Sequence, residues 1–341
     1  MNEFELLEKL RSALDTQDDR VVVGSGDDAA VVRPAGSLAV TSVDAFVEGV
    51  HFRLTTTSLG DLGHKCLAAS MSDIAAMGAG PGEAYVAVGV PDHLGERELL
   101  EFAAGLQALA REHRVAVVGG DLTRADELFV AVTVVGYANE DDRLVTRRGA
   151  RPGELVGVTG ALGGSGAGLL LLERKPAGID VQVAERLLER HLRPRPLVSA
   201  GRALAAAGVS AMIDVSDGIA ADLARLCEQS QVSLEVQLDS LPLDEGVADV
   251  AASVAMDPLE VAAGAGEDYE LLFTAPAGAR DAVARAAADS GAPATWIGTV
   301  SGTGEPVPTL LDESGRPRRL AGWDHLRRGQ ERREPPGPAS R

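Results

Sequence analysis

The chain is poor in cysteine and has no paired-cysteine motif. Only Cys66 and Cys227 occur among its 341 residues, far apart in sequence, and no CxxC pair is present. Isolated cysteines of this kind are typical of buried apolar thiols in a reducing compartment. We therefore expect both to be buried and the protein to be cytoplasmic.

Long apolar runs and an excess of basic residues are also missing. No stretch of about 18 consecutive apolar residues occurs, so no transmembrane helix is expected. The first residues, MNEFELLEKLRSAL, form an acidic amphipathic pattern without the basic start and apolar run of a signal peptide. With 51 acidic against 32 basic residues, the formal charge is −19, which should repel nucleic acid and anionic membranes. Such a chain binds phosphates most easily where metal ions mediate the contact.

The common nucleotide and catalytic signatures are absent as well. The sequence has no GxxxxGK[ST] loop, no HRD or DFG, and neither HExxH nor GxSxG. The glycine-rich run 160–168, GALGGSGAG, follows an expected strand and opens an expected helix, so it could cradle a phosphate at the helix N-terminus. It lacks the register of a Rossmann dinucleotide motif.

What is present predicts two α/β domains. A chain of this length suggests domains of about 150 residues each, and 45% hydrophobic residues with 39 glycines suit an α/β enzyme. Helices are expected at 3–14, 62–77, 96–112, 169–173 and 219–228. Strands are expected at 38–46, 84–90, 115–118, 128–137, 155–159, 211–215, 233–238, 271–274 and 296–300. A turn-rich stretch before residue 151 predicts domains at 1–150 and 151–326, followed by a disordered tail at 327–341.

Aspartates recur in five glycine-rich segments beside apolar runs. The segments are GSGDDAAV (24–31), TSVDAFVEGVHF (41–52), SMSDIAAMGA (70–79), GGDLTR (119–124) and DVSDGIAADL (214–223). Carboxylates that converge next to buried strands repel one another and need a compensating cation. Magnesium, which binds carboxylates together with substrate phosphates, is the natural candidate. A single Asp of this type more often caps a helix or closes a turn, but five similar segments weaken that alternative.

In this order the five segments resemble the thiamine-monophosphate kinase family of the aminoimidazole-ribonucleotide-synthetase-like superfamily. LVTRRGARPG (144–153), HLRPRP (191–196), GEDYELLF (266–273) and GWDH (322–325) extend the resemblance over nearly the whole chain. It implies an α/β (α+β) fold of two domains, an N-terminal sheet that pairs across a homodimer, and transfer of the γ-phosphoryl group of ATP to thiamine monophosphate.

The resemblance also implies site residues. Several magnesium ions would be held by Asp27, Asp28, Ser42, Val43, Asp44, Asp73, Asp121, Asp214 and Asp217. ATP would contact Gly120, Asp121, Arg147, Ser216 and His113. Thiamine monophosphate would contact His51, Glu267 and Trp323. No residue is expected to act as a general base, because a phosphate acceptor is already ionised at neutral pH.

Alternatives exist for several of these positions. Trp323 could stack on a cationic thiazolium or be an ordinary core tryptophan. Val43 replaces a common threonine and could offer only its backbone carbonyl, and His113 stands where a tyrosine is common. Among sister enzymes, selenophosphate synthetases need a reactive residue earlier than Cys66, and the hydrogenase-maturation member ends in cysteine rather than PASR. A calcium-binding module would need EF-hand spacing, which no segment supplies.

Overall fold

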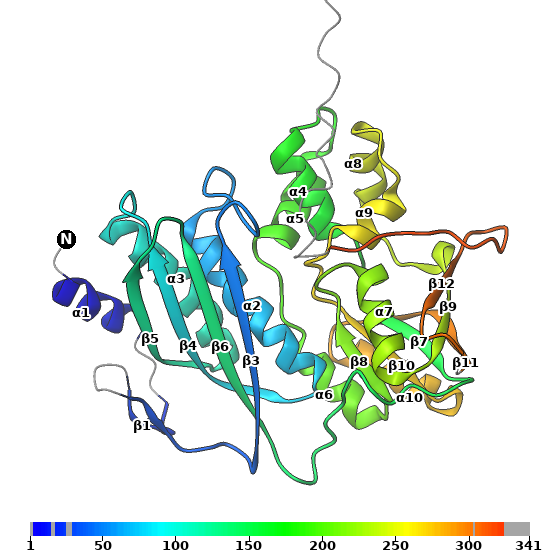
Figure 1. The fold of residues 1–341 in the computed structure, drawn as a ribbon, viewed down its shortest axis with the longest axis horizontal. Coiled ribbons are helices and arrows are strands. Elements are labelled where there is room, and N and C mark those ends of the chain that lie inside the picture. The colour runs from blue at the N-terminus through cyan, green and yellow to red at the C-terminus, as the bar shows by residue number, and fades with distance from the viewer. Residues whose placement is uncertain (1–2, 15–17, 25–28, 303, 324–341) are drawn as a thin grey trace, which may run out of the picture.

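The computed structural model describes residues 3–14, 18–24, 29–302 and 304–323, and these residues contain two large sheets with their helices and one two-stranded sheet (Figure 1). Its N-terminal half holds a four-stranded sheet in the order β3-β6-β4-β5, and its C-terminal half a six-stranded sheet in the order β12-β9-β11-β7-β10-β8. Asp27, Asp28 and the tail at 327–341 lie outside the described residues. Two short strands, β1 (Val21–Val23) and β2 (Val31–Val32), pair beside the first sheet.

The N-terminal sheet is covered by helices on one face only. It consists of β3 (Leu38–Val47), β4 (Gly80–Val90), β5 (Ala116–Arg124) and β6 (Phe129–Ala138), and its helices are α1 (Glu3–Leu14), α2 (Leu59–Ala76) and α3 (Glu96–His113). Along β6, Val130, Val132 and Val134 are fully buried, and the residues between them are half-buried. This period of two places one face against α2 and α3 and leaves the other uncovered.

Helix α2 is buried on nearly all sides because it lies between the sheet and the C-terminal half (Figure 1). It approaches α3 closely through glycines: a Cβ on Gly105 would lie 1.8 Å from the carbonyl oxygen of Gly60. Side chains at this crossing are therefore excluded, and the two helices pack backbone to backbone. The close packing fixes α2 as a rigid support between the two halves.

The C-terminal sheet is covered on both faces. Its strands are β7 (Leu155–Thr159), β8 (Ala211–Asp214), β9 (Ser233–Gln237), β10 (Leu271–Ala275), β11 (Ala294–Gly302) and β12 (Pro308–Leu311). On one face α7 (Ile219–Ser230) packs against Ile213, Leu234 and other apolar residues. On the other face α6 (Val198–Ala207) and α10 (Arg280–Asp289) pack around Phe273. Fully buried apolar strands such as β8 and β10 follow from this arrangement.

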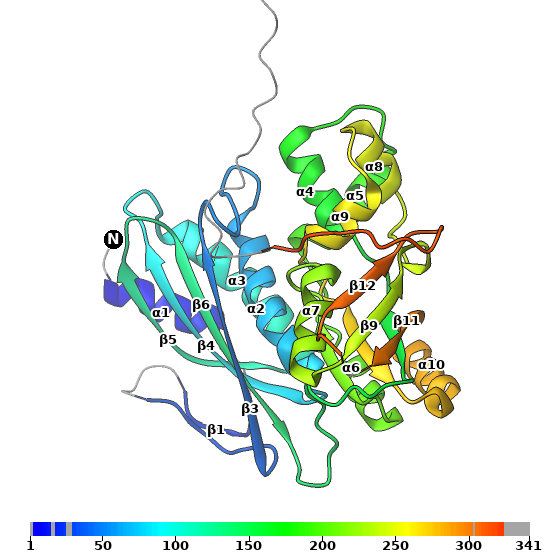
Figure 2. The ribbon, with the colours of Figure 1, turned by 45° about the vertical axis from the view of Figure 1, so that its right-hand side comes forward.

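A separate group of helices lies beside this sheet (Figure 2). It consists of α4 (Gly164–Arg174), α5 (Val181–Leu192), α8 (Val247–Ser253) and α9 (Pro258–Gly264), which share a small apolar core around Leu187.

The expected helices and strands are all present, with ends displaced by a few residues. The sequence patterns missed α5, α6, α8, α9, α10, β1, β2 and β12, and they placed the start of α4 five residues too late. Both cysteines are buried and free, as predicted. Over the described ranges of the chain, no helix combines the length and apolar character needed to cross a membrane.

Candidate active site

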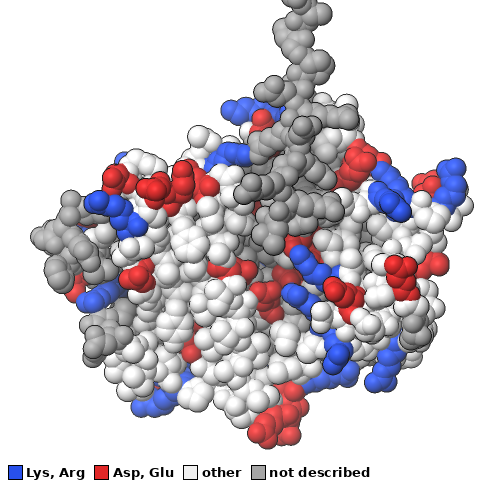
Figure 3. Space-filling model, viewed as in Figure 1, with Lys and Arg blue, Asp and Glu red and all other residues white. Residues whose placement is uncertain are grey.

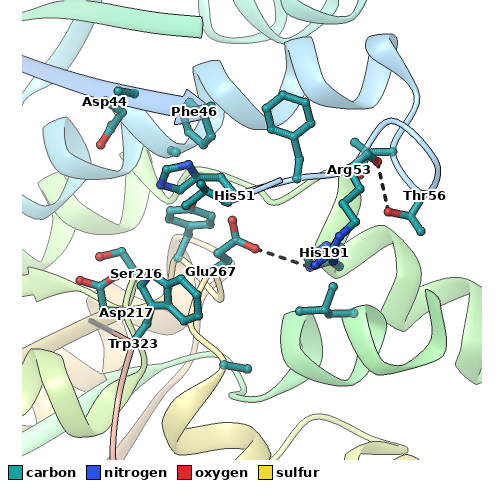
Figure 4. A pocket seen from close by; sticks show the side chains of 18 of the residues that line it. Asp44, Phe46, His51, Arg53, Thr56, His191, Ser216, Asp217, Glu267 and Trp323 are labelled. Carbon is teal, nitrogen blue, oxygen red and sulfur yellow. Dashed lines mark hydrogen bonds and ion pairs between the residues drawn. The ribbon is translucent and has the colours of Figure 1, made fainter. Parts of the chain in front are cut away.

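A cavity of about 1360 Å³ lies between the two halves of the molecule. Its N-terminal wall comes from β3, the loop after β3 and the last turn of α2. Its C-terminal wall comes from the end of β8, the loop before β10, α4 and the end of the described chain (Figure 4). Ten residues expected from the sequence line it: Val43, Asp44, His51, Asp73, Arg147, Asp214, Ser216, Asp217, Glu267 and Trp323.

Three elements bring the carboxylates of this cavity together. Asp44 is supplied by β3, Asp73 by α2, and Asp214 by the end of β8. Alternation along β3 turns Ser42 and Asp44 toward α2, and the Ser42 hydroxyl donates to the Asp73 carboxylate. The hydroxyl of Ser72 donates to Asp214 Oδ2 at 2.8 Å, which ties the N-terminal half to the C-terminal half.

These carboxylates destabilise one another's charge. Burial and the neighbouring Asp73 raise the pKa of Asp44 to about 6, and the same two causes raise the pKa of Asp214 well above its usual value. Oδ2 of Asp44 is buried and has no hydrogen-bond partner in the described part of the chain. A hard divalent cation fits such a donor set, because it would supply the missing positive charge to oxygen ligands. No three acidic, histidine or cysteine side chains among the described residues form a ready-made metal site.

The turn that carries Ser216 and Asp217 is held by two residues that the sequence patterns missed. Asp222 Oδ2 accepts the backbone N–H groups of Ser216 and Asp217, at 3.1 and 3.2 Å. Arg225 donates to Asp222 Oδ1 at 2.7 Å and also pairs with the Asp217 carboxylate. Burial raises the pKa of Asp222 to about 7, although Arg225 opposes this. The spacing of Asp222 in the first turn of α7 and Arg225 three residues later was the available signal.

The far end of the cavity is aromatic and imidazole-rich. The rings of Phe46 and His51 meet edge to face with centroids 5.9 Å apart, and His51 Nδ1 accepts the N–H of Val47 at 3.0 Å. Trp323 lies at the rim with 48% of its surface exposed, and its backbone N–H donates to the Asp217 carbonyl. The alternative of a core tryptophan is therefore wrong.

Glu267 stands near the cavity floor in an unusual backbone conformation. Its φ is +60°, in the left-handed region, and its N–H donates to the Ser216 carbonyl at 2.8 Å. Its Oε2 accepts a hydrogen bond of 2.7 Å from Lys65 Nζ and lies 3.6 Å from His191 Nδ1. A strained backbone that is fixed by its surroundings is a common feature of functional sites.

Four expected residues do not line this cavity. Ser42 lines a smaller neighbouring one that also contacts Asp73. Gly120 and Asp121 line a third cavity of about 550 Å³ together with residues of α1 and α3. His113 lies at the end of α3, with Nε2 3.9 Å from Glu112.

Two expectations of local structure are wrong, one at Asp121 and one at the glycine run 160–168. Asp121 was expected at the end of a buried strand, but β5 continues beyond it to Arg124, and Asp121 is exposed in mid-strand. The strand can continue because glycine permits close pairing: a Cβ on Gly120 would lie 2.0 Å from the Val86 carbonyl oxygen.

The glycine run 160–168 is not a free phosphate cradle. The N–H groups of Gly163 and Ser165 donate to the two carboxylate oxygens of Asp268, at 2.7 and 3.1 Å. The start of α4 therefore already binds an anion that belongs to the protein.

Comparison with known proteins agrees with this architecture. Residues 26–138 match the family "AIR synthase related protein, N-terminal domain", and residues 151–310 match "AIR synthase related protein, C-terminal domain". The fold is thus that of a two-domain AIR synthase-related protein.

Individual relatives are more specific. The thiamine-monophosphate kinase of Rhodopirellula baltica is 37% identical over 294 residues, which cover 83% of this chain and 84% of the relative. The crystal structure of the thiamine-monophosphate kinase from Stenotrophomonas maltophilia superposes with a TM-score of 0.80 at 34% identity, covering 93% of this chain and 98% of that one. A further structure, AaThiL complexed with AMPPCP and TMP, has a TM-score of 0.75 at 29% identity and covers 95% and 97% of the two chains. The chain belongs to the thiamine-monophosphate kinase family.

Proposed function

We propose that this protein transfers the γ-phosphoryl group of ATP to thiamine monophosphate in the central cavity, giving thiamine diphosphate and ADP. One observation carries the proposal: Asp44, Asp73, Asp214 and Asp217 line the same cavity as His51, Glu267 and Trp323. An anion-binding end that needs cations and an end suited to a cationic ring system thus share one cavity. The family relatives carry this activity in their names.

The reaction needs positioning and charge neutralisation more than proton transfer. An oxygen of the acceptor phosphate attacks the γ-phosphorus, and the bond from that phosphorus to the β-bridging oxygen breaks, so that ADP leaves with the electron pair. The acceptor oxygen is already ionised, so the chain needs no general base. Its carboxylates, Arg147 and Ser216 must instead hold two anionic groups close together.

We propose that magnesium ions are held by the side chains of Ser42, Asp44, Asp73, Asp214 and Asp217 and by the Val43 carbonyl. The Val43 side chain is 61% exposed and lies on the opposite face of β3 from Asp44, so only its backbone is available. When bound, magnesium would neutralise phosphate charge and orient the γ-phosphoryl group. Asp27, Asp28 and Asp121 complete the proposed ligand set.

The thiamine half is assigned to the opposite end of the cavity. The indole of Trp323, exposed at the rim, offers a face on which a thiazolium or pyrimidine ring stacks. His51 and Glu267 provide an imidazole and a carboxylate at the floor, between β3 and the loop before β10 (Figure 4). This end selects the acceptor, whereas the carboxylate end binds ATP.

We further propose that the protein is a homodimer that pairs through the uncovered face of the N-terminal sheet. This face shows few charged atoms (Figure 3) and carries the exposed Val43 and the half-buried Ala131, Thr133 and Val135. Large uncovered apolar faces are typical of interfaces. Pairing would let Gly120 and Asp121 of one chain serve ATP at the subunit junction, and His113 is the remaining proposed ATP contact.

The interface is tested by Val135→Asp, which places a charge on this face. Size-exclusion chromatography with light scattering is expected to give a dimer for the wild type and a monomer for the variant. A monomeric wild type would contradict the proposed interface.

The activity is tested by incubating the purified protein with ATP, Mg²⁺ and thiamine monophosphate and following thiamine diphosphate by chromatography. Thiamine diphosphate is expected only when all three are present. Phosphorylation of free thiamine in place of the monophosphate would show that the acceptor is wrong. We also propose that the protein acts in the cytoplasm.

A further inference from the structure

Lys65 is a fully buried cation behind the wall of the central cavity. It lies near the middle of α2 with only 1% of its surface exposed. It is not among the residues that line the cavity. A buried ammonium group is unfavourable unless an anion compensates it, so its partner indicates its purpose.

That partner is Glu267, in the other half of the molecule. Lys65 Nζ donates to Glu267 Oε2 at 2.7 Å, which joins α2 to the loop before β10. The side chain of Glu267 is 22% exposed and lines the cavity. The ion pair thus has its cation in the protein interior and its anion at the cavity surface.

The same carboxylate oxygen of Glu267 has a second neighbour, His191. His191 Nδ1 lies 3.6 Å from the same Oε2 and 3.1 Å from the Ser165 hydroxyl. The hydrogen bonds and ion pairs recorded for the Glu267 carboxylate within the described residues all involve Oε2. Figure 4 shows Glu267 between His51 and His191, with one carboxylate oxygen joined to His191.

The charges of this group favour a single fixed anion. Burial alone would raise the pKa of Glu267, but its neighbours, Lys65 first among them, outweigh burial, and the pKa lies below its usual value. Burial and then Lys65 lower the pKa of His191 to about 4, so that this imidazole is neutral at pH 7. Glu267 therefore presents a full negative charge to the cavity.

We infer that Lys65 is a positioning residue for acceptor recognition, because it holds the Glu267 carboxylate in one place and leaves Oε1 to bind the cationic thiamine half of the substrate. The inference rests on the proposed function. Lys65 acts through Glu267 and touches no substrate itself. Its removal should weaken acceptor binding and leave ATP binding at the carboxylate end intact.

Three variants test this inference as a cycle: Lys65→Met, Glu267→Gln and the double variant. Lys65→Met is expected to raise KM for thiamine monophosphate about tenfold and to leave KM for ATP within about twofold. The double variant is expected to show the same KM for thiamine monophosphate as Glu267→Gln alone, because without the carboxylate Lys65 has nothing to position. Lys65→Arg, which keeps a cation, should recover part of the loss.

A matched control separates recognition from stability. Glu83→Gln removes a carboxylate, 2% exposed, that pairs with Arg20 and lies outside the central cavity. It is expected to lower Tm without changing KM for thiamine monophosphate. If Lys65→Met folds poorly, the double variant still decides, since it leaves no unpaired buried charge.

Two results would overturn the inference: an unchanged KM for thiamine monophosphate in Lys65→Met, or additive effects of the two substitutions. If the wild type phosphorylates thiamine monophosphate, either of these results leaves the proposed function unaffected. A wild type that does not phosphorylate thiamine monophosphate would instead remove the proposed function.

Discussion

Two groups of buried carboxylates in this molecule are compensated in opposite ways. In the C-terminal half, Glu270 accepts from Thr159 at 2.7 Å and from Arg190 at 3.0 Å, and Asp268 accepts two backbone N–H groups. In the central cavity, Asp44 and Asp214 face Asp73, and the pKa of each is raised by burial and by that neighbour. The first group contains its own cation, and the second faces a cavity.

The difference separates acids that the fold itself compensates from acids that face the cavity without such compensation. Both groups raise carboxyl pKa values, so a raised pKa alone does not distinguish them. What distinguishes them is the partner: Arg190 is part of the fold, whereas Asp44 Oδ2 has no partner in the described part of the chain. A buried acid whose compensation is missing from the protein indicates a ligand.

The largest expected effect is on the cavity acids. Asp44→Asn should lower kcat/KM by roughly 10²–10³-fold, because it removes charge that holds metal and phosphate. The same change relieves repulsion from Asp73, so Tm without metal should stay equal or rise. Steady-state kinetics and thermal melts with and without Mg²⁺ check both points: Mg²⁺ should raise Tm of the wild type more than that of the variant. A fully active Asp44→Asn would show that this acid is not needed to hold metal or phosphate, and the proposed difference between the two groups of acids would be wrong.

The next effect concerns the structural group. Arg190→Met leaves Glu270 and Asp268 without their cation, whereas Asp244 keeps Arg186, and it should lower the free energy of unfolding by about 3–5 kcal/mol. Urea unfolding followed by circular dichroism measures the loss. Activity per folded molecule should remain, because Arg190 does not line the cavity. If Arg190→Met lost activity without losing stability, the group around Arg190 would serve activity and not the stability of the fold.

The pH dependence of stability offers a finer test. Burial raises the pKa of Glu270 to about 7, against about 4.3 for an unfolded chain. Between these values the folded state binds more protons than the unfolded state, so stability falls as pH rises from about 5 to 7. The limit is about 1.4 kcal/mol per pH unit for one proton. Glu270→Gln should flatten this slope in urea unfolding series at pH 5, 6 and 7, whereas an unchanged slope would assign it to other groups.

The smallest expected effect is at the mouth of the cavity. Arg53 Nη1 and Glu173 Oε1 lie 2.6 Å apart and join the loop after β3 to α4, but both side chains are partly exposed, at 36% and 29%. Arg53→Ala should lower the free energy of unfolding by less than about 1 kcal/mol. Glu173→Ala should have an effect of equal size, and the double variant should be no worse. A larger loss would mean that this ion pair holds the two halves together.

The acids of the candidate site have local signals in the sequence, whereas His51, Glu267 and Trp323 were expected from the family resemblance. Asp73 was identified by an aspartate inside an apolar helical pattern, and Asp214 by an acid at the end of a buried strand. Nearly every long strand was predicted from its β-branched run. These signals depend only on neighbouring residues, and the helices and strands that they predict are present in the folded structure.

The residues that were missed depend on how distant segments pack. Lys65 on α2 and His191 on α5 were missed, because only the packing of the two halves brings them to Glu267, which the family resemblance had implied. Asp121 was misplaced because its glycines looked like a strand end, whereas pairing with β4 continues through them. Pairing partners and packing of halves are long-range properties that composition and periodicity do not contain.

Helix α2 carries both Lys65, which positions Glu267, and Asp73, a proposed magnesium ligand. Lys65 and Asp73 are eight residues apart, which is about 12 Å along a helix axis. The helix therefore fixes the distance between the residue that positions Glu267 and an acid of the proposed magnesium site. Inserting one residue between them would rotate Asp73 by about 100° around the helix axis relative to Lys65 and increase their axial separation by about 1.5 Å. The spacing of these two residues is as much a part of the active site as their identity.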